Sequence, residues 1–135
     1  MKYKKQLKAV ALAMVLASGA SATFAQAEES IQFGLCFDLS KSYSFITPQL
    51  AQAARDLAMY ANDNGGIEGH PVEIIVRDHG NEPQRGVECY EQLKRDGVFI
   101  FNFMSTPVTN AALPRAMKDG NILMQSFVGR GDAVD

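Results

Sequence analysis

The sequence predicts an α/β fold built on a doubly wound parallel sheet. One observation is a stretch in which an amphipathic helix is followed by a glycine turn and a nearly buried strand. The other is that strand and helix patterns alternate over residues 31–124 in the order β-α-β-α-β-α-β. Right-handed crossovers between parallel strands turn this order into a sheet with helices on both faces. We expect the strand order 2-1-3-4.

The first predicted strand and helix occupy residues 31–63. Residues 31–37 alternate between large apolar and smaller or polar side chains, as a strand does. Thr47 and Pro48 are suited to the N-cap and first position of the helix that follows, and Gly65-Gly66 can end it. Its apolar residues recur at helical spacing along one stripe. The stripe consists of Leu50, Ala53, Ala54, Leu57, Ala58 and Ala61.

Three more strands and two more helices follow. Residues 72–76 place three branched apolar side chains on one face and Glu73 and Ile75 on the other, which predicts a nearly buried second strand. The second helix is expected to run from residue 82 or 83 to residue 96. A third strand is expected at 98–103, and a fourth at 122–124. Between them lies a helix at 107–119, which Pro114 is predicted to kink or restart.

The first 27 residues have the features of a secretory signal peptide. Four early lysines precede an apolar run at residues 9–20, and Ala25-Gln26-Ala27 is a small-x-small cleavage site. The apolar run is shorter than the roughly 18–20 residues of a spanning helix, which argues against an uncleaved anchor. We therefore expect cleavage after Ala27, a periplasmic location, and one domain over residues 28–135.

The charge of the predicted mature chain disfavours nucleic acid and anionic membranes as partners. Loss of the leader leaves nine basic and 15 acidic residues, a formal charge of −6. The chain also has no basic run. Small molecules are the favoured partners.

The glycine turn and its flanks resemble a known family. After the first helix come residues 64–73, Asn-Gly-Gly-Ile-Glu-Gly-His-Pro-Val-Glu, and then a strand that ends at Asp78. This order is similar to the first lobe of bacterial substrate-binding proteins of the branched-chain amino acid type. The resemblance extends from Ile31 to about Asp132 and includes residues 81–84, Asn-Glu-Pro-Gln, which open the next helix. It identifies residues 28–135 as an incomplete N-terminal lobe.

The resemblance implies binding rather than catalysis, with no cofactor. Members of the family close two lobes around a solute, and the closed form docks on the membrane permease of an ABC importer. The implied ligand is an amino acid or an amide-like solute. A sensory receptor module is an alternative, because related lobes serve as extracellular receptor domains. A small exported α/β enzyme is a second alternative, although no Gly-x-Ser-x-Gly elbow is present.

Ser105-Thr106-Pro107, after the third predicted strand, is the strongest candidate site. Ligands of doubly wound sheets bind outside the carboxyl ends of the strands. A helix N-terminus there offers backbone amides and a positive dipole end to an anionic group. The resemblance implies that Ser105 and Thr106 grip the ligand carboxylate. The alternative is that either residue only caps the helix.

Two further loops supply candidate ligand contacts. By resemblance, the loop after the fourth strand contributes Ser126, Val128 and Arg130, although Phe127 to Arg130 departs from the Ser/Thr, Pro and Ala of the family. Arg130 could pair with a second carboxylate or be a solvated charge. In the first loop, Phe45 could cover a ligand or serve as packing.

Two remaining groups of residues were tested for other chemistry. Asp78, His79 and Glu82 have no spacing typical of a metal site, so we predict no metal and interpret them as solvated loop residues. Cys36 lies on the strand face opposite Leu35, and Cys89 on the inward side of the second helix. In the order 2-1-3 that helix crosses the first strand, so a disulfide and two buried thiols both remain open.

Overall fold

The computed structural model describes residues 29–126 and contains one four-stranded parallel sheet. The strand order is β2-β1-β3-β4, which confirms the predicted order and the α/β class. Among these residues no helix has the length and apolar character needed to cross a bilayer. In chain order the elements are β1 (Ile31–Phe37), α2 (Thr47–Asp63), β2 (Val72–Asp78), α3 (Pro83–Arg95), β3 (Ile100–Asn102), α4 (Thr106–Asp119) and β4 (Ile122–Met124).

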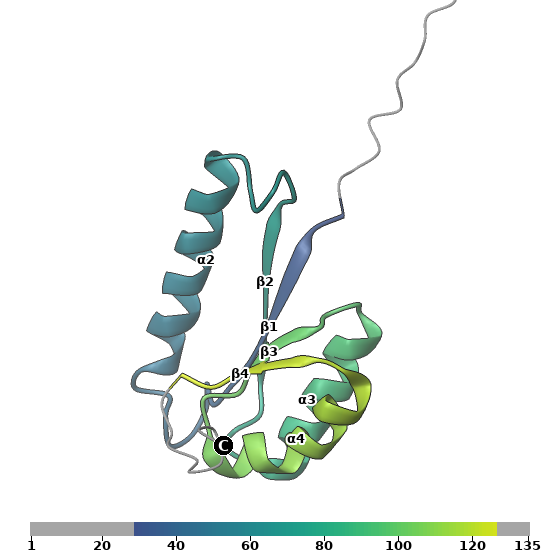
Figure 1. Cartoon of the computed structure of the whole chain (residues 1–135). Helices are drawn as coiled ribbons and strands as arrows, with labels where there is room; N and C mark the ends of the chain where they lie inside the picture. Colours follow the sequence, from purple (N-terminus) through teal and green to yellow (C-terminus); the bar gives the residue numbers. More distant parts are fainter. Residues whose placement is uncertain (1–28, 127–135) are drawn as a thin grey trace, which may run out of the picture.

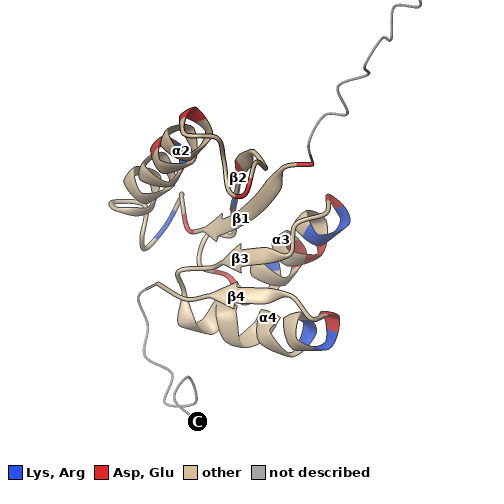
Figure 2. Ribbon diagram, turned by 45° about the horizontal axis from the view of Figure 1, so that its top comes forward, with Lys and Arg blue, Asp and Glu red and all other residues tan. Residues whose placement is uncertain are grey.

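The helices divide unequally between the two faces of the sheet. α3 and α4 lie side by side against one face, and α2 lies alone against the other (Figure 1). We call the first the closed face and the second the open face. Figure 2 shows α2 near β2 and β1. On this open face no helix of the described residues covers β3 and β4, whose other face is covered by α3 and α4.

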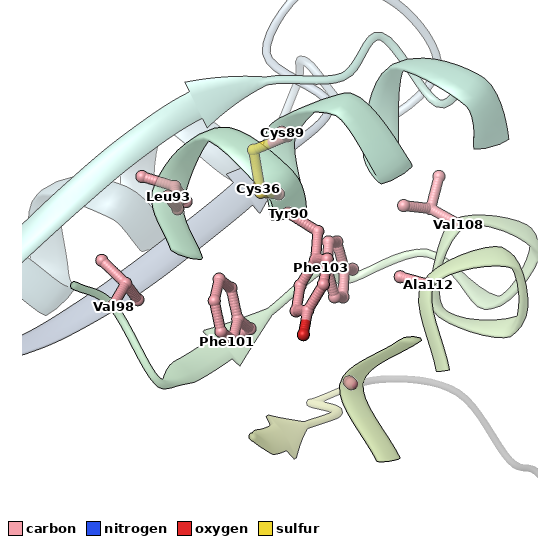
Figure 3. Packing of buried hydrophobic residues seen from close by; sticks show 10 residues of the cluster. Cys36, Cys89, Tyr90, Leu93, Val98, Phe101, Phe103, Val108 and Ala112 are labelled. Atoms are coloured by element: carbon pink, nitrogen blue, oxygen red, sulfur yellow. A yellow bond between two sulfur atoms is a disulfide. The ribbon is translucent and has the colours of Figure 1, made fainter. Parts of the chain in front are cut away.

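The closed face contains the main hydrophobic core. Tyr90 and Leu93 of α3 pack against Phe101 and Phe103, and none of the four is more than 1% exposed (Figure 3). The ring centroids of Tyr90 and Phe101 lie 4.8 Å apart. Gly34 lets Leu93 of α3 pack closely against β1, because a Cβ at position 34 would lie 2.8 Å from Leu93 Cδ1.

A disulfide joins Cys36 of β1 to Cys89 of α3 on the closed face. Both residues are buried, and their Cα atoms lie 6.2 Å apart. α3 crosses β1, as the strand order requires. Cys89 therefore lies above Cys36, whose side chain points to the closed face of β1 (Figure 3). Of the two alternatives that the sequence left open, the structure contains the bonded one.

The open face is only partly covered. Ala51 and Ala58 are the residues of α2 beyond Thr47 that are fully buried. Ala53 is exposed and Leu57 is 67% exposed, so the predicted stripe is wrong at these two positions. Periodicity predicts which residues of a helix share a side, whereas the width of the covered strip depends on what lies beside the helix. Here nothing in the described residues covers the flank that carries Leu57.

Three local predictions need correction. Thr47 is the first residue of α2 and not its N-cap, which is Ile46; the buried Thr47 hydroxyl instead contacts the carbonyl oxygens of Asp38 and Tyr43. β3 is shorter than predicted, because the N–H of Val98 donates to Leu93 O in the turn that ends α3. α4 is one helix across Pro114, so of the two expected effects of this proline, a kink or a restart, the restart does not occur.

Candidate functional site

The candidate site lies where the four strands end. Parallel strands bring their carboxyl ends to one edge of the sheet, so the loops that follow β1, β2, β3 and β4 meet there (Figure 1). These loops comprise residues 38–46, 79–82, 103–105 and 125–126.

A buried carboxylate holds the loop after β1 in shape by accepting hydrogen bonds from its backbone. Asp38 is 1% exposed. Its Oδ1 accepts from Lys41 N at 2.7 Å and its Oδ2 from Tyr43 N at 2.9 Å. These bonds fold residues 38–43 back on the end of β1 and leave Phe45 74% exposed in the same loop. Phe45, a predicted ligand contact, therefore projects from this edge without packing on it.

A second carboxylate ties the first loop to β2. Asp78 accepts from Leu39 N at 3.0 Å, from Ser40 Oγ at 2.8 Å and from Arg85 Nη2 at 3.2 Å. Burial acts to raise the pKa of Asp78, but these donors and Gly80 N outweigh it and hold the pKa below its ordinary value. The Asp78 carboxylate is therefore ionised, and its oxygens already accept hydrogen bonds from the loops after β1 and β2.

An exposed ion pair also connects the loop after β1 to the loop after β2. Lys41 Nζ contacts Glu82 Oε1, and the hydrogen bond from Lys41 lowers the pKa of Glu82. Both side chains are about half exposed, at 53% and 48%, so the contribution of this pair to stability is small.

His79 connects the loops after β2 and β3. Its side chain is fully buried, so the interpretation of His79 as a solvated loop residue is wrong. The N–H of Asn81 can only donate and the carbonyl of Phe103 can only accept. Nδ1 therefore accepts from Asn81 N at 2.8 Å, and Nε2–H donates to Phe103 O at 2.9 Å. Both ring nitrogens are in use, which accounts for the burial.

The turn between β3 and α4 has an unusual backbone. Met104 has a φ of 49°, in the left-handed region that side chains other than glycine and asparagine rarely adopt, and it is 5% exposed. Its side chain packs with Leu35, Phe37 and Ala51, and its N–H donates to Asn102 Oδ1 at 3.1 Å. Packing and this hydrogen bond hold the strained turn that presents Ser105 and Thr106.

Ser105 and Thr106 differ in what their hydroxyls can do. Ser105 is the N-cap of α4 by position but makes no side-chain capping bond. It is fully buried, and its Oγ donates to Asn81 Oδ1 at 2.6 Å. Thr106 is half-buried, and within residues 29–126 its hydroxyl makes no hydrogen bond. Thr106 is therefore the hydroxyl of this pair that remains available to a ligand.

The backbone of α4 adds donors beside that hydroxyl. The first N–H groups of a helix have no intrahelical acceptor, and Pro107 at the second helical position contributes no N–H. Counting only partners in the part of the chain that the structure describes, the N–H of Thr109 is the first that is bonded, to Ser105 O at 2.8 Å. The amides of Thr106 and Val108 therefore join the Thr106 hydroxyl at the positive end of the α4 dipole.

The remaining predicted residues lie at the limit of the described chain. Ser126 Oγ contacts the Asn102 side-chain amide, so this residue does lie at the edge where β3 and β4 end. Val128 and Arg130 fall outside residues 29–126. Within that range no three His, Cys, Asp or Glu side chains are grouped as metal ligands would be.

Sequence reasoning missed Asn81 and Met104 and misjudged His79. Asn81 has a φ of 55° and connects His79 to Ser105. Its position in a loop, with asparagine's tolerance for left-handed backbone, is a weak signal that a sequence does carry. Nothing local predicts that Met104 is left-handed.

Comparison with known proteins gives a consistent result. A sequence model of the family described as "Periplasmic binding protein" matches residues 30–134. The Leu/Ile/Val-binding protein homolog 1 of Brucella abortus (strain 2308) is 27% identical over 107 residues, which is 78% of this chain and 28% of that protein.

Two solved structures share the fold at similar identity. The fatty acid ABC transporter substrate-binding protein from Thermomonospora curvata superposes with a TM-score of 0.68 at 29% identity, over 73% of this chain and 25% of that one. The branched-chain amino acid transporter substrate-binding protein LivJ from Streptococcus pneumoniae, in complex with isoleucine, gives 0.63 at 25% identity, over 72% and 28%. The chain thus spans about a quarter of the length of these relatives.

Proposed function

We propose, on the premise that the chain belongs to the periplasmic binding protein family, that it forms one lobe of the solute-binding protein of an ABC importer. The solute is a small amino acid or amide-like molecule held between this lobe and a second one. The single observation that carries the proposal is the turn at the N-terminus of α4, where the Thr106 hydroxyl and the first helical amides bond to none of the residues 29–126.

The chemistry of that turn favours a carboxylate. Amides and a hydroxyl at the positive end of a helix stabilise an anion through charge-assisted hydrogen bonds. Isoleucine, bound by the Streptococcus pneumoniae relative, and fatty acids, named for the Thermomonospora curvata relative, both carry a carboxylate. We infer that Thr106 contacts this shared group and that Phe45, Ser126, Val128 and Arg130 face the remainder of the solute.

The same edge lacks the arrangement that a hydrolytic enzyme needs. Ser105 Oγ donates to an amide oxygen and not to a base, and both nitrogens of His79 are bonded to backbone groups. Asp78 is occupied by loop donors. A nucleophile paired with a base is therefore absent from this edge within residues 29–126, which supports binding over catalysis.

Members of the family are extracytoplasmic, and the proposal extends this to the present chain. Its leader would be cleaved after Ala27 and the product would act in the periplasm, where the closed form would dock on the permease. A ligand-sensing receptor is the alternative, and a membrane-spanning segment downstream in the complete protein would favour it.

The proposal is tested with a chimera in which this chain replaces the aligned part of the Brucella abortus relative. Calorimetry with amino acids and their amides should detect binding, and Thr106→Ala should weaken it on the order of 10- to 100-fold, the effect of removing one charge-assisted partner. Thr106→Ser keeps the hydroxyl and should bind nearly as well as the parent chimera. Equal affinity of the parent and Thr106→Ala chimeras would contradict the proposed site.

The chain alone provides a second arm. A half-cleft leaves the ligand in water, so each hydrogen bond contributes only about 1 kcal/mol net. We expect binding too weak for calorimetry. Tight binding by the chain alone would show that the ligand is not held between two lobes.

A further inference from the structure

The side chain of Asn81 reaches from the loop after β2 to the turn that begins α4. Its Oδ1 accepts a hydrogen bond from Ser105 Oγ at 2.6 Å, and Ser105 directly precedes Thr106 in the chain. Asn81 is half-buried, whereas Ser105 is fully buried. The exposed part of Asn81 therefore lies beside the hydroxyl that we propose as a contact of the solute carboxylate.

One end of the Asn81 carboxamide is occupied and the other is open. A side-chain amide has an acceptor oxygen and an NH2 group with two donors. The Ser105 hydroxyl occupies the oxygen, and Nδ2 donates to none of the residues 29–126. Asn102, at the same edge of the sheet, differs because its Nδ2 contacts Ser126 Oγ and its Oδ1 accepts from Met104 N. Asn81 thus retains donors that the described loops do not use.

The backbone of Asn81 holds this side chain in a fixed position. Its φ is 55°, in the left-handed region that asparagine tolerates better than most residues. Its N–H donates to Nδ1 of the fully buried His79 at 2.8 Å, and His79 Nε2 donates to Phe103 O at 2.9 Å. Main chain and side chain of Asn81 are therefore connected separately to the loop between β3 and α4. A donor held in this way loses little conformational entropy when a ligand binds.

We propose that Asn81 is a further solute-binding residue, whose Nδ2 donates to the carboxylate held at the N-terminus of α4. The inference rests on the proposed function, because it adds a partner to the same site. The Thr106 hydroxyl and the α4 amides come from the chain after β3, whereas Asn81 comes from the loop after β2. A carboxylate has about four lone-pair positions on its two oxygens, so it can accept from both groups of donors at once.

The donor character of Asn81 also makes it a specificity-determining residue. A carboxylate accepts hydrogen bonds with both of its oxygens, whereas a carboxamide has one oxygen and an NH2 group that would face another donor. Asn81 Nδ2 and the first amides of α4 can only donate. This end of the site should therefore favour a carboxylate over the corresponding amide, which narrows the proposed solutes to carboxylic acids.

Three substitutions separate contact with the solute from support of the turn. Ser105→Ala removes the hydrogen bond to Asn81 and leaves the Nδ2 donors in place. Asn81→Gly removes both and keeps the left-handed backbone accessible. Asn81→Asp keeps an acceptor for Ser105 and tolerates the same backbone, but it replaces the donors with a negative charge. Each variant is made in the Brucella abortus chimera, and calorimetry measures its affinity for each standard amino acid and for the corresponding amide.

The variants should differ in size of effect and in selectivity. Ser105→Ala should weaken binding of an amino acid by less than about 3-fold, whereas Asn81→Gly should weaken it by about 10-fold or more, the effect of losing a charge-assisted partner. Asn81→Asp should weaken binding of the acid by about 100-fold but that of its amide by only about 3-fold, because the new carboxylate repels the acid and accepts from the amide NH2. The midpoint of thermal unfolding of Asn81→Asp should stay within about 2 °C of the parent, because Ser105 keeps its acceptor.

The outcomes distinguish this inference from the proposed function. Equal losses for Asn81→Gly and Ser105→Ala would show that Asn81 only supports the turn, and would overturn the inference. An unchanged ratio of acid to amide affinity in Asn81→Asp would also overturn it, and this ratio decides alone if Asn81→Gly does not fold. In either case a loss of affinity in Thr106→Ala would leave the proposed function standing. A folded parent chimera that binds none of these compounds would overturn the proposed function and the inference with it.

Discussion

The two faces of the sheet are formed by the same strands, but helices cover them to different extents. Phe101 and Ile100 are neighbours on β3, yet Phe101 is 1% exposed under α3 and α4, whereas Ile100 is only half-buried beside α2. Leu123 packs against the closed-face core, whereas Met124 is 50% exposed. The strand sequence makes both faces apolar, and the helices decide which one becomes a core. The stability of the described chain should therefore come mainly from the closed face.

The largest effect expected from this comparison is at β3. Phe101→Ala should lower the free energy of unfolding by about 3–5 kcal/mol, because it opens a cavity between Tyr90 and Phe103. Ile100→Ala on the open face should cost less, about 1–2 kcal/mol, since that side chain is only partly buried. Urea unfolding of both variants measures the difference, and equal losses would contradict the contrast between the faces.

The disulfide on the closed face should have the next largest effect. Cys36 and Cys89 are 53 residues apart. Closing a loop of that length is worth about 4 kcal/mol in the chain-entropy description, and native disulfides typically contribute about 2–4 kcal/mol. The Cys36→Ala, Cys89→Ala double variant should be less stable than the oxidised wild type by about 2–4 kcal/mol, and reductant should destabilise the wild type but not the variant. Intact mass after alkylation of unfolded wild-type protein should show no free thiol, and two alkylated thiols would rule the bond out.

A single added methyl group should distinguish the faces on a smaller scale. Gly34→Ala places a Cβ 2.8 Å from Leu93 Cδ1 and 3.0 Å from Val98 Cγ1, and such overpacking costs about 1–3 kcal/mol. On the open face, Ala61→Leu adds three carbons to the apolar pocket between α2 and the sheet. This change should alter stability by less than about 0.5 kcal/mol, because that pocket has room for the larger side chain. Thermal unfolding of the two variants compares them directly.

The smallest effect concerns acid. On the closed face Asp119 accepts from Lys94 Nζ and Tyr90 OH, each at 2.7 Å, and these donors lower the pKa of Asp119 below its ordinary 3.8. A depressed pKa contributes stability above the unfolded value, and this contribution is lost as pH falls through the folded value. Between pH 5 and pH 2.5 the wild-type chain should lose more stability than Asp119→Asn. Tyr90→Phe, which removes one donor, should fall between them; identical acid profiles would show that the pair is not coupled to folding.

Much of the fold follows from local sequence pattern. The alternation in residues 31–37 predicted β1 with its observed bounds, and the order of elements predicted the strand order. Strand parity and that order showed that a contact between Cys36 and Cys89 was possible, but they left the disulfide and two buried thiols open, and the structure contains the disulfide. These predictions succeed because side-chain alternation, helical periodicity and crossover handedness are properties of short segments.

The errors arise where the burial or the hydrogen bonds of a residue depend on residues that are distant in the sequence. Leu57 has the spacing of a buried residue, but its burial depends on a neighbour that α2 does not have among the described residues. His79 was interpreted as solvated because the sequence does not show that Phe103 O lies 2.9 Å from its ring. At the candidate site, sequence placed Ser105 and Thr106 on one turn but could not predict that Asn81 engages only the first.

Among residues 29–126 the sheet has two edge strands, β2 and β4, and they differ in how well they resist pairing with another chain. β2 has seven residues, and it carries the exposed charges of Glu73 and Arg77, which disfavour the addition of a further strand beside it. β4 has three residues, all apolar, and depends on its shortness alone. Intermolecular strand addition, and the aggregation that follows from it, should therefore begin at β4. A lysine at Met124 would be the substitution of choice for keeping this chain soluble at high concentration.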